Sequence, residues 1–186
     1  MRNNMIKELE TQRLILRKPV IEDLKDFHKY ASKSNIGPNA GWLPHYSLEE
    51  SKHVLKSFIK ENNVWAITLK AYNKLIGTID LRDHDYFSHE VYEIGYSLDD
   101  KYWNKGIVTE ALNKVVDYAF GELKIKRLIA SHSENNIASQ KVLEKNGFVY
   151  THTEETTLYL SVGIKTIKWY EKLNIQEENN GNKIKD

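Results

Sequence analysis

The apolar positions of this chain follow two periods, one typical of strands and one typical of helices. Residues 14–17 form a short apolar run, which predicts a strand. Between 24 and 31 the apolar residues recur three or four positions apart, which is the spacing of one helical face. Ser47 and Glu50 then have the spacing of a capping box and predict the start of a second helix. The chain therefore begins with a strand and two helices.

Three strands and a third helix are predicted next. Residues 64–69 and 75–81 flank a connection of turn length, which favours an antiparallel hairpin, and 91–98 form another strand. The apolar residues from 108 to 119 share one helical face. Gly121 is placed to end that helix in a left-handed conformation.

The last third of the chain is predicted to contain three strands and one more helix. Residues 127–131 form a strand, after which Asn136 can cap a helix that ends near Gly147. Residues 148–155 and 163–170 alternate apolar or aromatic with polar side chains, which predicts a final pair of strands.

The order β-α-α-β-β-β-α-β-α-β-β predicts an α/β (α+β) fold, in which a mixed, mainly antiparallel central sheet carries helices on both faces. We expect residues 1–173 to form a single domain, because no Pro/Gly/Ser-rich linker divides them. Residues 174–186 are polar and charged and cannot bury enough apolar surface to offset the entropy of ordering. They are predicted to be a disordered tail.

Composition narrows the classes of function. Lys plus Arg number 27 against 26 Asp plus Glu, so the net charge of +1 predicts no binding to nucleic acid or to an anionic membrane. The chain has no cysteine, which excludes a disulfide framework and a thiolate nucleophile. Its seven histidines form no ligand-like pair, so no metal site is predicted. Without an apolar leader or a long apolar span, the protein is expected to be cytoplasmic, as a monomer or homodimer.

The connection at 102–109 is the strongest candidate for binding chemistry. It joins a strand to a helix, and the first N–H groups of a helix lack internal partners and attract anions. Gly106 lets the backbone approach a ligand, Lys105 adds a charge and Thr109 a hydroxyl. On these residues alone, a pyrophosphate site and a merely tight connection both remain open.

The full string 102–112, YWNKGIVTEAL, resembles the CoA-binding segment of the GNAT acetyltransferases, in particular the Rim-type ribosomal-protein N-terminal acetyltransferases. Residues 133–148, SENNIASQKVLEKNGF, are similar to the block that follows it in that family. The resemblance covers most of the chain up to Tyr170. Val108 departs from the family's Gly or Ala, so either the cofactor arm lies farther out or the valine points into the core.

The resemblance implies acetyl-CoA as cosubstrate, no metal, and transfer of acetyl to a primary amine. With no cysteine and no G-x-S-x-G motif, direct attack of the amine in a ternary complex is the simplest chemistry. The acceptor is expected to be a protein N-terminal amine, as in the Rim branch. A small-molecule acetyltransferase acting on a polyamine, amino sugar or antibiotic is the alternative, and a CoA-binding module without catalysis is another.

The resemblance also assigns roles to single residues. Glu93 is the candidate base and Ser139 the candidate acid, because Leu143 stands where many relatives have a catalytic tyrosine. A solvent-facing Glu93 and a Ser139 that bonds only local backbone are the structural alternatives. The backbone N–H groups of Ser97 and Leu98 are predicted to stabilise the oxyanion. Contacts with the cofactor are predicted at Ser97, Leu98, Trp103, Asn104, Lys105, Gly106, Ile107, Val108, Thr109, Asn136 and Lys141.

Two of these assignments have a plainer reading. Asn136 can serve as a helix cap, alone or together with a cofactor contact, and Lys141 can be an ordinary solvated charge. The acceptor is expected to meet the early helices and their loop, with candidate contacts at Trp42, His45, Tyr46, His84, Asp85 and Tyr86.

Overall fold

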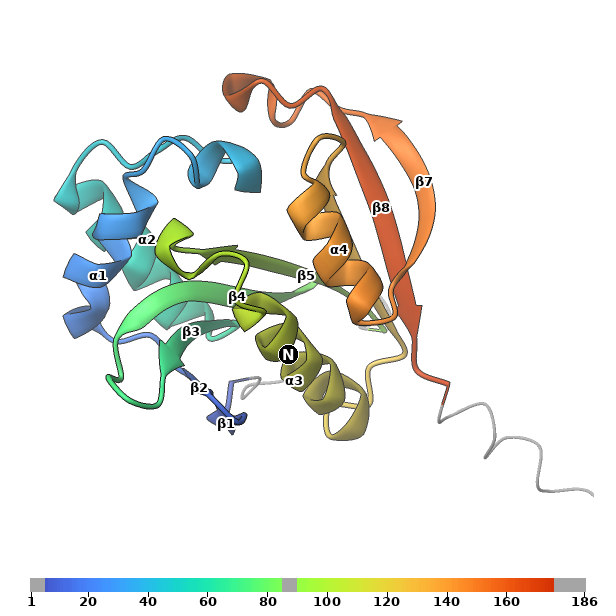
Figure 1. The fold of residues 1–186 in the computed structure, drawn as a ribbon, viewed down its shortest axis with the longest axis horizontal. Helices are drawn as coiled ribbons and strands as arrows, with labels where there is room; N and C mark the ends of the chain where they lie inside the picture. Colours follow the sequence, from blue (N-terminus) through green and yellow to red (C-terminus); the bar gives the residue numbers. More distant parts are fainter. Residues whose placement is uncertain (1–5, 85–89, 176–186) are drawn as a thin grey trace, which may run out of the picture.

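The computed structural model describes residues 6–84 and 90–175 (Figure 1). The strands are β1 (Leu9–Glu10), β2 (Leu14–Arg17), β3 (Val64–Leu69), β4 (Leu75–Asp83), β5 (Val91–Leu98), β6 (Arg127–Ser133), β7 (Val149–Glu155) and β8 (Thr166–Leu173). The α-helices are α1 (Leu24–Ala31), α2 (Leu48–Glu61), α3 (Ile107–Gly121) and α4 (Ile137–Lys145). Short 3-10 helices lie at Ile21–Asp23, Gly37–Ala40, Asp100–Tyr102 and Leu160–Val162.

The strands form a sheet of eight in the order β1-β2-β3-β4-β5-β6-β8-β7. Every neighbouring pair is antiparallel except β5 and β6, which are parallel. The predicted mixed, mainly antiparallel sheet is therefore confirmed. The structure adds β1, a strand of two residues that the sequence pattern was too short to reveal.

Helix ends follow local signals in most places. The Ser47 hydroxyl accepts a hydrogen bond from the Glu50 N–H at 3.1 Å and starts α2. Gly147 has φ +75° just after α4, as its sequence position predicts. The prediction for Gly121 is wrong: it is the last residue of α3, and the left-handed residue is Lys124, with φ 54°. The chain therefore turns away three residues later than the glycine.

The two faces of the sheet carry two apolar cores. Trp65 packs with Leu112 of α3 on one face, whereas its neighbour Ala66 packs with Phe27 of α1 and Leu55 of α2 on the other. Successive side chains of a strand point to opposite faces, so one strand serves both cores. Helices α1 and α2 thus cover one face and α3 and α4 the other (Figure 1).

The sheet opens between its two parallel strands. β5 pairs with β6 only from Val91 to Glu93, although β5 continues to Leu98. β6 stays paired with β8 along its whole length. Beyond Glu93 the edge of β5 is therefore free of β6, and the two strands diverge.

The C-terminal boundary differs slightly from the expectation. Asn174, assigned to the tail, is buried, and its amide donates to the carbonyls of Phe120 at 3.3 Å and Ile125 at 3.1 Å. It therefore belongs to the folded part. The rest of the predicted tail, from 176 on, lies outside the described residues. None of the described helices has both the length and the apolar character needed to cross a membrane.

Candidate functional site

The turn before α3 presents an uncapped helix N-terminus. Gly106 is the N-cap residue, with φ 70°, a conformation that glycine adopts without strain. No side chain caps the first turn of α3. The first N–H groups of the helix are thus left for a ligand, and an anion there is favoured by the helix dipole. The backbone of this turn fits a pyrophosphate.

An arginine and a glutamate far apart in the sequence brace this turn. Arg13 donates from Nη1 to the Lys105 carbonyl at 2.9 Å and from Nε to Glu110 Oε2 at 2.6 Å. Glu110 also accepts the Thr11 hydroxyl at 2.5 Å. Burial acts to raise the pKa of Glu110, but these hydrogen bonds lower it. The guanidinium lies beside Gly106, so Arg13 adds positive charge to the turn, a role that its distant position in the sequence concealed.

The side chains of the predicted CoA segment have different surroundings. Lys105 turns back onto the Lys101 carbonyl at 2.8 Å, away from the helix N-terminus. Trp103 donates from its indole to the Leu98 carbonyl at 2.9 Å. Val108 packs against the core, which answers the question that its sequence position raised. Ile107 is buried, so only its backbone can contact a ligand there.

The remaining residues of this segment lie at the turn as predicted from their order. Asn104 has a left-handed φ of 58° and is exposed, and Thr109 is half-buried in the first turn of α3. Ser97 and Leu98 end β5, in the part that has diverged from β6.

The second predicted block forms α4, beside the divergence. Asn136 caps the helix by accepting the Ser139 N–H at 3.1 Å and also donates to the Asn39 carbonyl at 3.2 Å. Lys141 is exposed on the outer surface of α4. Leu143 is fully buried in the core, where a tyrosine hydroxyl would lack water.

Ser139 is joined to a tyrosine that the sequence reasoning missed. The Tyr96 hydroxyl lies 2.7 Å from Ser139 Oγ and so bridges β5 and α4 across the divergence. Burial raises the pKa of Tyr96, and the hydrogen bond with Ser139 offsets only part of that effect. The phenol thus stays protonated at neutral pH and can donate.

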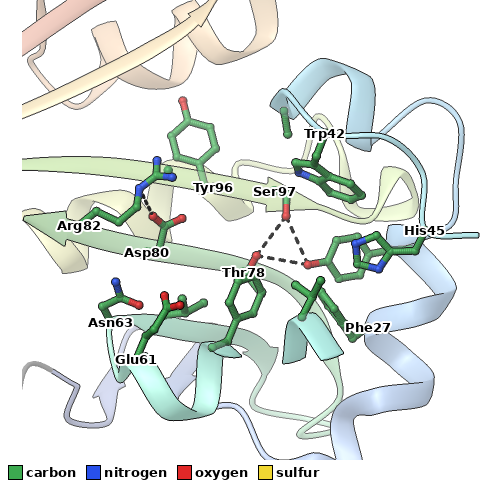
Figure 2. A pocket seen from close by; sticks show the side chains of 16 residues that line it. Phe27, Trp42, His45, Glu61, Asn63, Thr78, Asp80, Arg82, Tyr96 and Ser97 are labelled. Carbon is green, nitrogen blue, oxygen red and sulfur yellow. Dashed lines mark hydrogen bonds and ion pairs between the residues drawn. The ribbon is translucent and has the colours of Figure 1, made fainter. Parts of the chain in front are cut away.

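A pocket of about 390 Å³ lies on the other face of the same strands (Figure 2). Its aromatic wall comes from α1, α2 and the loop between them, and its floor from β4 and β5. The aromatic lining residues are Phe27, Tyr30, Trp42, His45 and Phe58. The floor residues are Thr78, Asp80, Arg82, Gly95, Tyr96 and Ser97. A pocket with apolar walls and a few polar groups is typical of a small-ligand site.

Three hydroxyl groups meet in the lining of the pocket. Tyr30 Oη lies 3.2 Å from Thr78 Oγ1 and 3.3 Å from Ser97 Oγ, which are 3.1 Å apart (Figure 2). Burial raises the pKa of Tyr30 to about 12, against the opposing effect of these bonds. The cluster is neutral and can orient a polar group of a ligand.

Two carboxylates and an arginine occupy one end of the pocket region. Asp80 Oδ2 lies 2.9 Å from Arg82 Nε, and Glu93 Oε1 lies 3.5 Å from Arg82 Nη2. His84 Nδ1 lies 3.9 Å from Glu93 Oε2. Glu93 shares a strand face with Gly95, yet it is Asp80 and Arg82 that line the pocket. The predicted base, Glu93, is thus close to the pocket, but the carboxylates that line it are those of Asp80 and Glu61.

The predicted acceptor contacts are divided. Trp42 and His45 line the pocket, whereas Tyr46 is 97 % exposed. The His45 Nδ1 bonds Ser51 Oγ at 2.8 Å, and burial lowers the pKa of this imidazole. Asp85 and Tyr86 lie outside the described residues. Among residues 6–84 and 90–175, no group of three or more His, Asp or Glu side chains is arranged to hold a metal ion.

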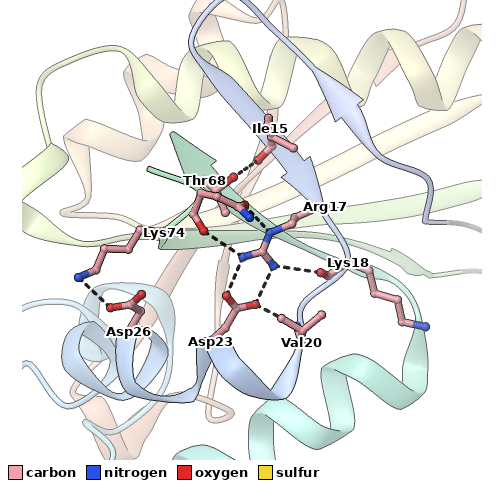
Figure 3. Close-up of polar contacts among 9 residues, drawn as sticks. Ile15, Arg17, Lys18, Val20, Asp23, Asp26, Thr68 and Lys74 are labelled. Carbon is pink, nitrogen blue, oxygen red and sulfur yellow. Dashed lines mark hydrogen bonds and ion pairs between the residues drawn. The ribbon is translucent and has the colours of Figure 1, made fainter. Parts of the chain in front are cut away.

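A second hollow, of about 370 Å³, is lined by polar residues whose contacts stabilise the fold. Arg17 forms two hydrogen bonds with Asp23, at 2.8 and 2.7 Å, and a third with Asn73 at 2.8 Å (Figure 3). These bonds pair the guanidinium of Arg17 with the buried Asp23 carboxylate and tie β2 to the start of α1. The pair is therefore structural.

Comparison with known proteins agrees with this geometry. Residues 13–149 match the family described as "Acetyltransferase (GNAT) domain". The uncharacterized N-acetyltransferase YnaD of Bacillus subtilis (strain 168) is 30 % identical over 144 residues, which are 75 % of this chain and 81 % of YnaD.

Solved structures share the fold. A GNAT-family acetyltransferase from Bacillus anthracis has a TM-score of 0.80 and 26 % identity, covering 90 % of this chain and 99 % of that one. Ribosomal-protein-S5-alanine acetyltransferase from Vibrio fischeri has a TM-score of 0.77 and 24 % identity, covering 91 % and 98 %. The chain belongs to the GNAT family and is an acetyl-CoA-dependent N-acetyltransferase.

Proposed function

We propose that the protein acetylates the N-terminal α-amine of a polypeptide, by direct attack in a ternary complex. The observation that carries this proposal is the position of Gly95, Tyr96 and Ser97. They lie in the diverged part of β5, with α4 on one side and the aromatic pocket on the other. One strand thus separates a cofactor side from an acceptor side, and two substrates can meet at its edge.

The cofactor side is proposed as follows. The free N–H groups of α3, Gly106 and the Arg13 guanidinium receive the pyrophosphate. The remaining candidates for cofactor contacts are Asn104 and Thr109 at the turn before α3, and Asn136 and the exposed Lys141 on α4. Bound acetyl-CoA supplies the activated acetyl group as a thioester.

The reacting groups are proposed around β5. Backbone N–H groups near Ser97 and Leu98 stabilise the oxyanion, as donors aimed at developing charge do. The Tyr96–Ser139 pair returns a proton to the leaving sulfur, because both hydroxyls are protonated and joined at 2.7 Å. Asp80 and Glu61, which line the pocket, and Glu93, which lies 3.5 Å from Arg82, are the candidate bases among the described residues.

The polypeptide acceptor is supported by two loops that carry exposed apolar side chains. Leu43, which follows the pocket-lining Trp42, is 57 % exposed, and Leu158, which precedes Tyr159, is 80 % exposed. The Tyr159 ring packs on Gly41, where an added Cβ would lie 2.9 Å away, so the two loops touch. Exposed apolar side chains near a pocket can pack against the first residues of a polypeptide whose N-terminal amine enters that pocket. The Vibrio fischeri neighbour is named for an alanine of a ribosomal protein, which is the same class of acceptor.

The test is release of thiol from acetyl-CoA in the presence of purified protein and defined amines. Lysine-free peptides with a free N-terminal amine should be acetylated, and the same peptides with a blocked N-terminus should not. Turnover of polyamines or amino sugars alone would replace the polypeptide acceptor with a small molecule. Tight CoA binding without turnover of any amine would favour the inactive module.

A further inference from the structure

Asp80 lies in the pocket floor, and the residue paired with it on the neighbouring strand is a glycine. Asp80 is in the middle of β4, directly across from Gly95, and its side chain is only 21 % exposed (Figure 2). A Cβ on Gly95 would come within 2.7 Å of Asp80 Oδ1. The glycine therefore lets the carboxylate approach β5 just beyond the last pair with β6, Glu93 with Ile129.

The carboxylate is short of hydrogen-bond donors. Arg82 Nε is 2.9 Å from Oδ2, yet Oδ2 accepts no hydrogen bond with good geometry from any residue that the structure describes. The same guanidinium is shared with Glu93, at 3.5 Å. A buried acceptor without a donor is uncommon in proteins and costs stability. Oδ2 itself is closed to solvent, so an ammonium in the pocket would donate to Oδ1, the oxygen that lies beside Gly95, and would compensate a carboxylate that its neighbours leave under-bonded.

We infer that Asp80 binds the ammonium of the acceptor and takes the proton that its nitrogen must lose before attack. This inference rests on the proposed function, because it requires an amine acceptor. In this inference Glu93 is not the base. Its role is to hold the guanidinium of Arg82, which lies 3.5 Å from it, beside Asp80.

The transfer then balances. The ammonium gives one proton to the Asp80 carboxylate, and the freed lone pair forms the C–N bond with the acetyl carbonyl carbon. The C–S bond breaks, and its electron pair leaves with sulfur. The second proton of the nitrogen reaches that sulfur by way of the Tyr96 and Ser139 hydroxyls, and Asp80 returns its proton to solvent.

The charges around Asp80 suit this task. Together these surroundings raise the pKa of Asp80 to about 6: burial raises it most, Arg82 on β4 opposes that effect, and Glu93 on β5 and Glu61 on α2 add smaller increases. A base works best when its pKa is near the operating pH, because it is then ionised and still binds a proton well. An ordinary aspartate would bind the proton too weakly.

The test compares Asp80→Asn with Asp117→Asn, the same chemical change at an exposed position of α3. For the wild type, with its best amine, kcat/KM should fall at low pH with an apparent pKa near 6. Asp80→Asn should lower kcat/KM by about 100-fold or more and remove this acid limb, as the loss of a general base does. Its affinity for CoA and its fold, measured by calorimetry and circular dichroism, should be unchanged.

Glu93→Gln separates the two carboxylates. Because the Glu93 charge raises the pKa of Asp80, the acid limb should remain and move to lower pH. A limb that disappears in Glu93→Gln and persists in Asp80→Asn would overturn the inference in favour of Glu93. Wild-type turnover in Asp80→Asn would overturn it outright.

A second readout does not depend on turnover. In ¹³C-carboxyl-labelled protein without acetyl-CoA, the resonance lost in Asp80→Asn should titrate near 6 and shift to lower pH when a saturating peptide amine is added. No shift on adding the amine would refute contact with the ammonium. If the wild type acetylates small amines but no peptide, the proposal of a polypeptide acceptor is wrong, and the role of Asp80 is tested with the small amine. If the wild type acetylates no amine, the proposed function and the role of Asp80 are both wrong.

Discussion

Replacing Asp80 by asparagine is expected to stabilise the protein at neutral pH while it impairs catalysis. The folded protein holds the pKa of Asp80 at about 6, above the 3.8 of an unperturbed aspartate. Ionising this carboxyl is therefore harder in the folded state than in the unfolded one. A group of this kind makes the wild type less stable as the pH rises through the interval between these two values.

The size of the effect follows from the shift. The difference between about 6 and 3.8 corresponds to about 3 kcal/mol at 1.36 kcal/mol for each pKa unit. Asparagine has nearly the same shape and never ionises, so it resembles the protonated acid. Below about pH 4 the variant and wild type should be equally stable, and above about pH 6 the variant should gain up to about 3 kcal/mol.

Urea unfolding at about pH 4 and about pH 8 measures this difference, since other titrating groups cancel between variant and wild type. Asp117→Asn is again the matched control and should show no pH-dependent difference. An Asp80→Asn variant that is less stable than wild type near pH 8, or whose difference does not change with pH, would refute the reasoning. A gain in stability with a loss of turnover is the pattern expected of a functional residue.

Three further substitutions test the surrounding structure. Arg13→Met should weaken acetyl-CoA binding by about tenfold in calorimetry, because charge-assisted hydrogen bonds are worth about 1.5–3 kcal/mol, and unchanged affinity would remove Arg13 from the cofactor site. Arg17→Met should cost about 3–5 kcal/mol in urea unfolding, because Asp23 stays buried without its partner; a loss under about 1 kcal/mol would contradict this. Tyr96→Phe should lower kcat by about tenfold or more with acetyl-CoA affinity retained, and a normal kcat would exclude its hydroxyl from proton transfer.

The sequence predicted those features that depend on nearby residues. Ser47 caps its helix through a backbone group three residues away, and Gly147 takes the left-handed conformation directly after α4. The turn at 102–109 was found for the same reason, because an exposed helix N-terminus and Gly106 are local properties. Gly121 shows the limit: a glycine marks where a helix can end, but the residue that adopts the left-handed conformation is Lys124, three positions later.

What the tertiary structure decided depends on strand register and on contacts between distant residues. Arg13 reaches the turn from 92 residues away, Tyr96 meets Ser139 across 43, and Asp80 faces Gly95 because β4 and β5 pair in that register. A register shift of one residue would turn Asp80 to the other face of the sheet. The sequence thus determined the fold class, the family and the exposed turn before α3 that we propose binds the cofactor. Only the packing of strands and helices decided which carboxylates line the pocket and which hydroxyls meet in its lining, because those contacts join residues that no local pattern connects.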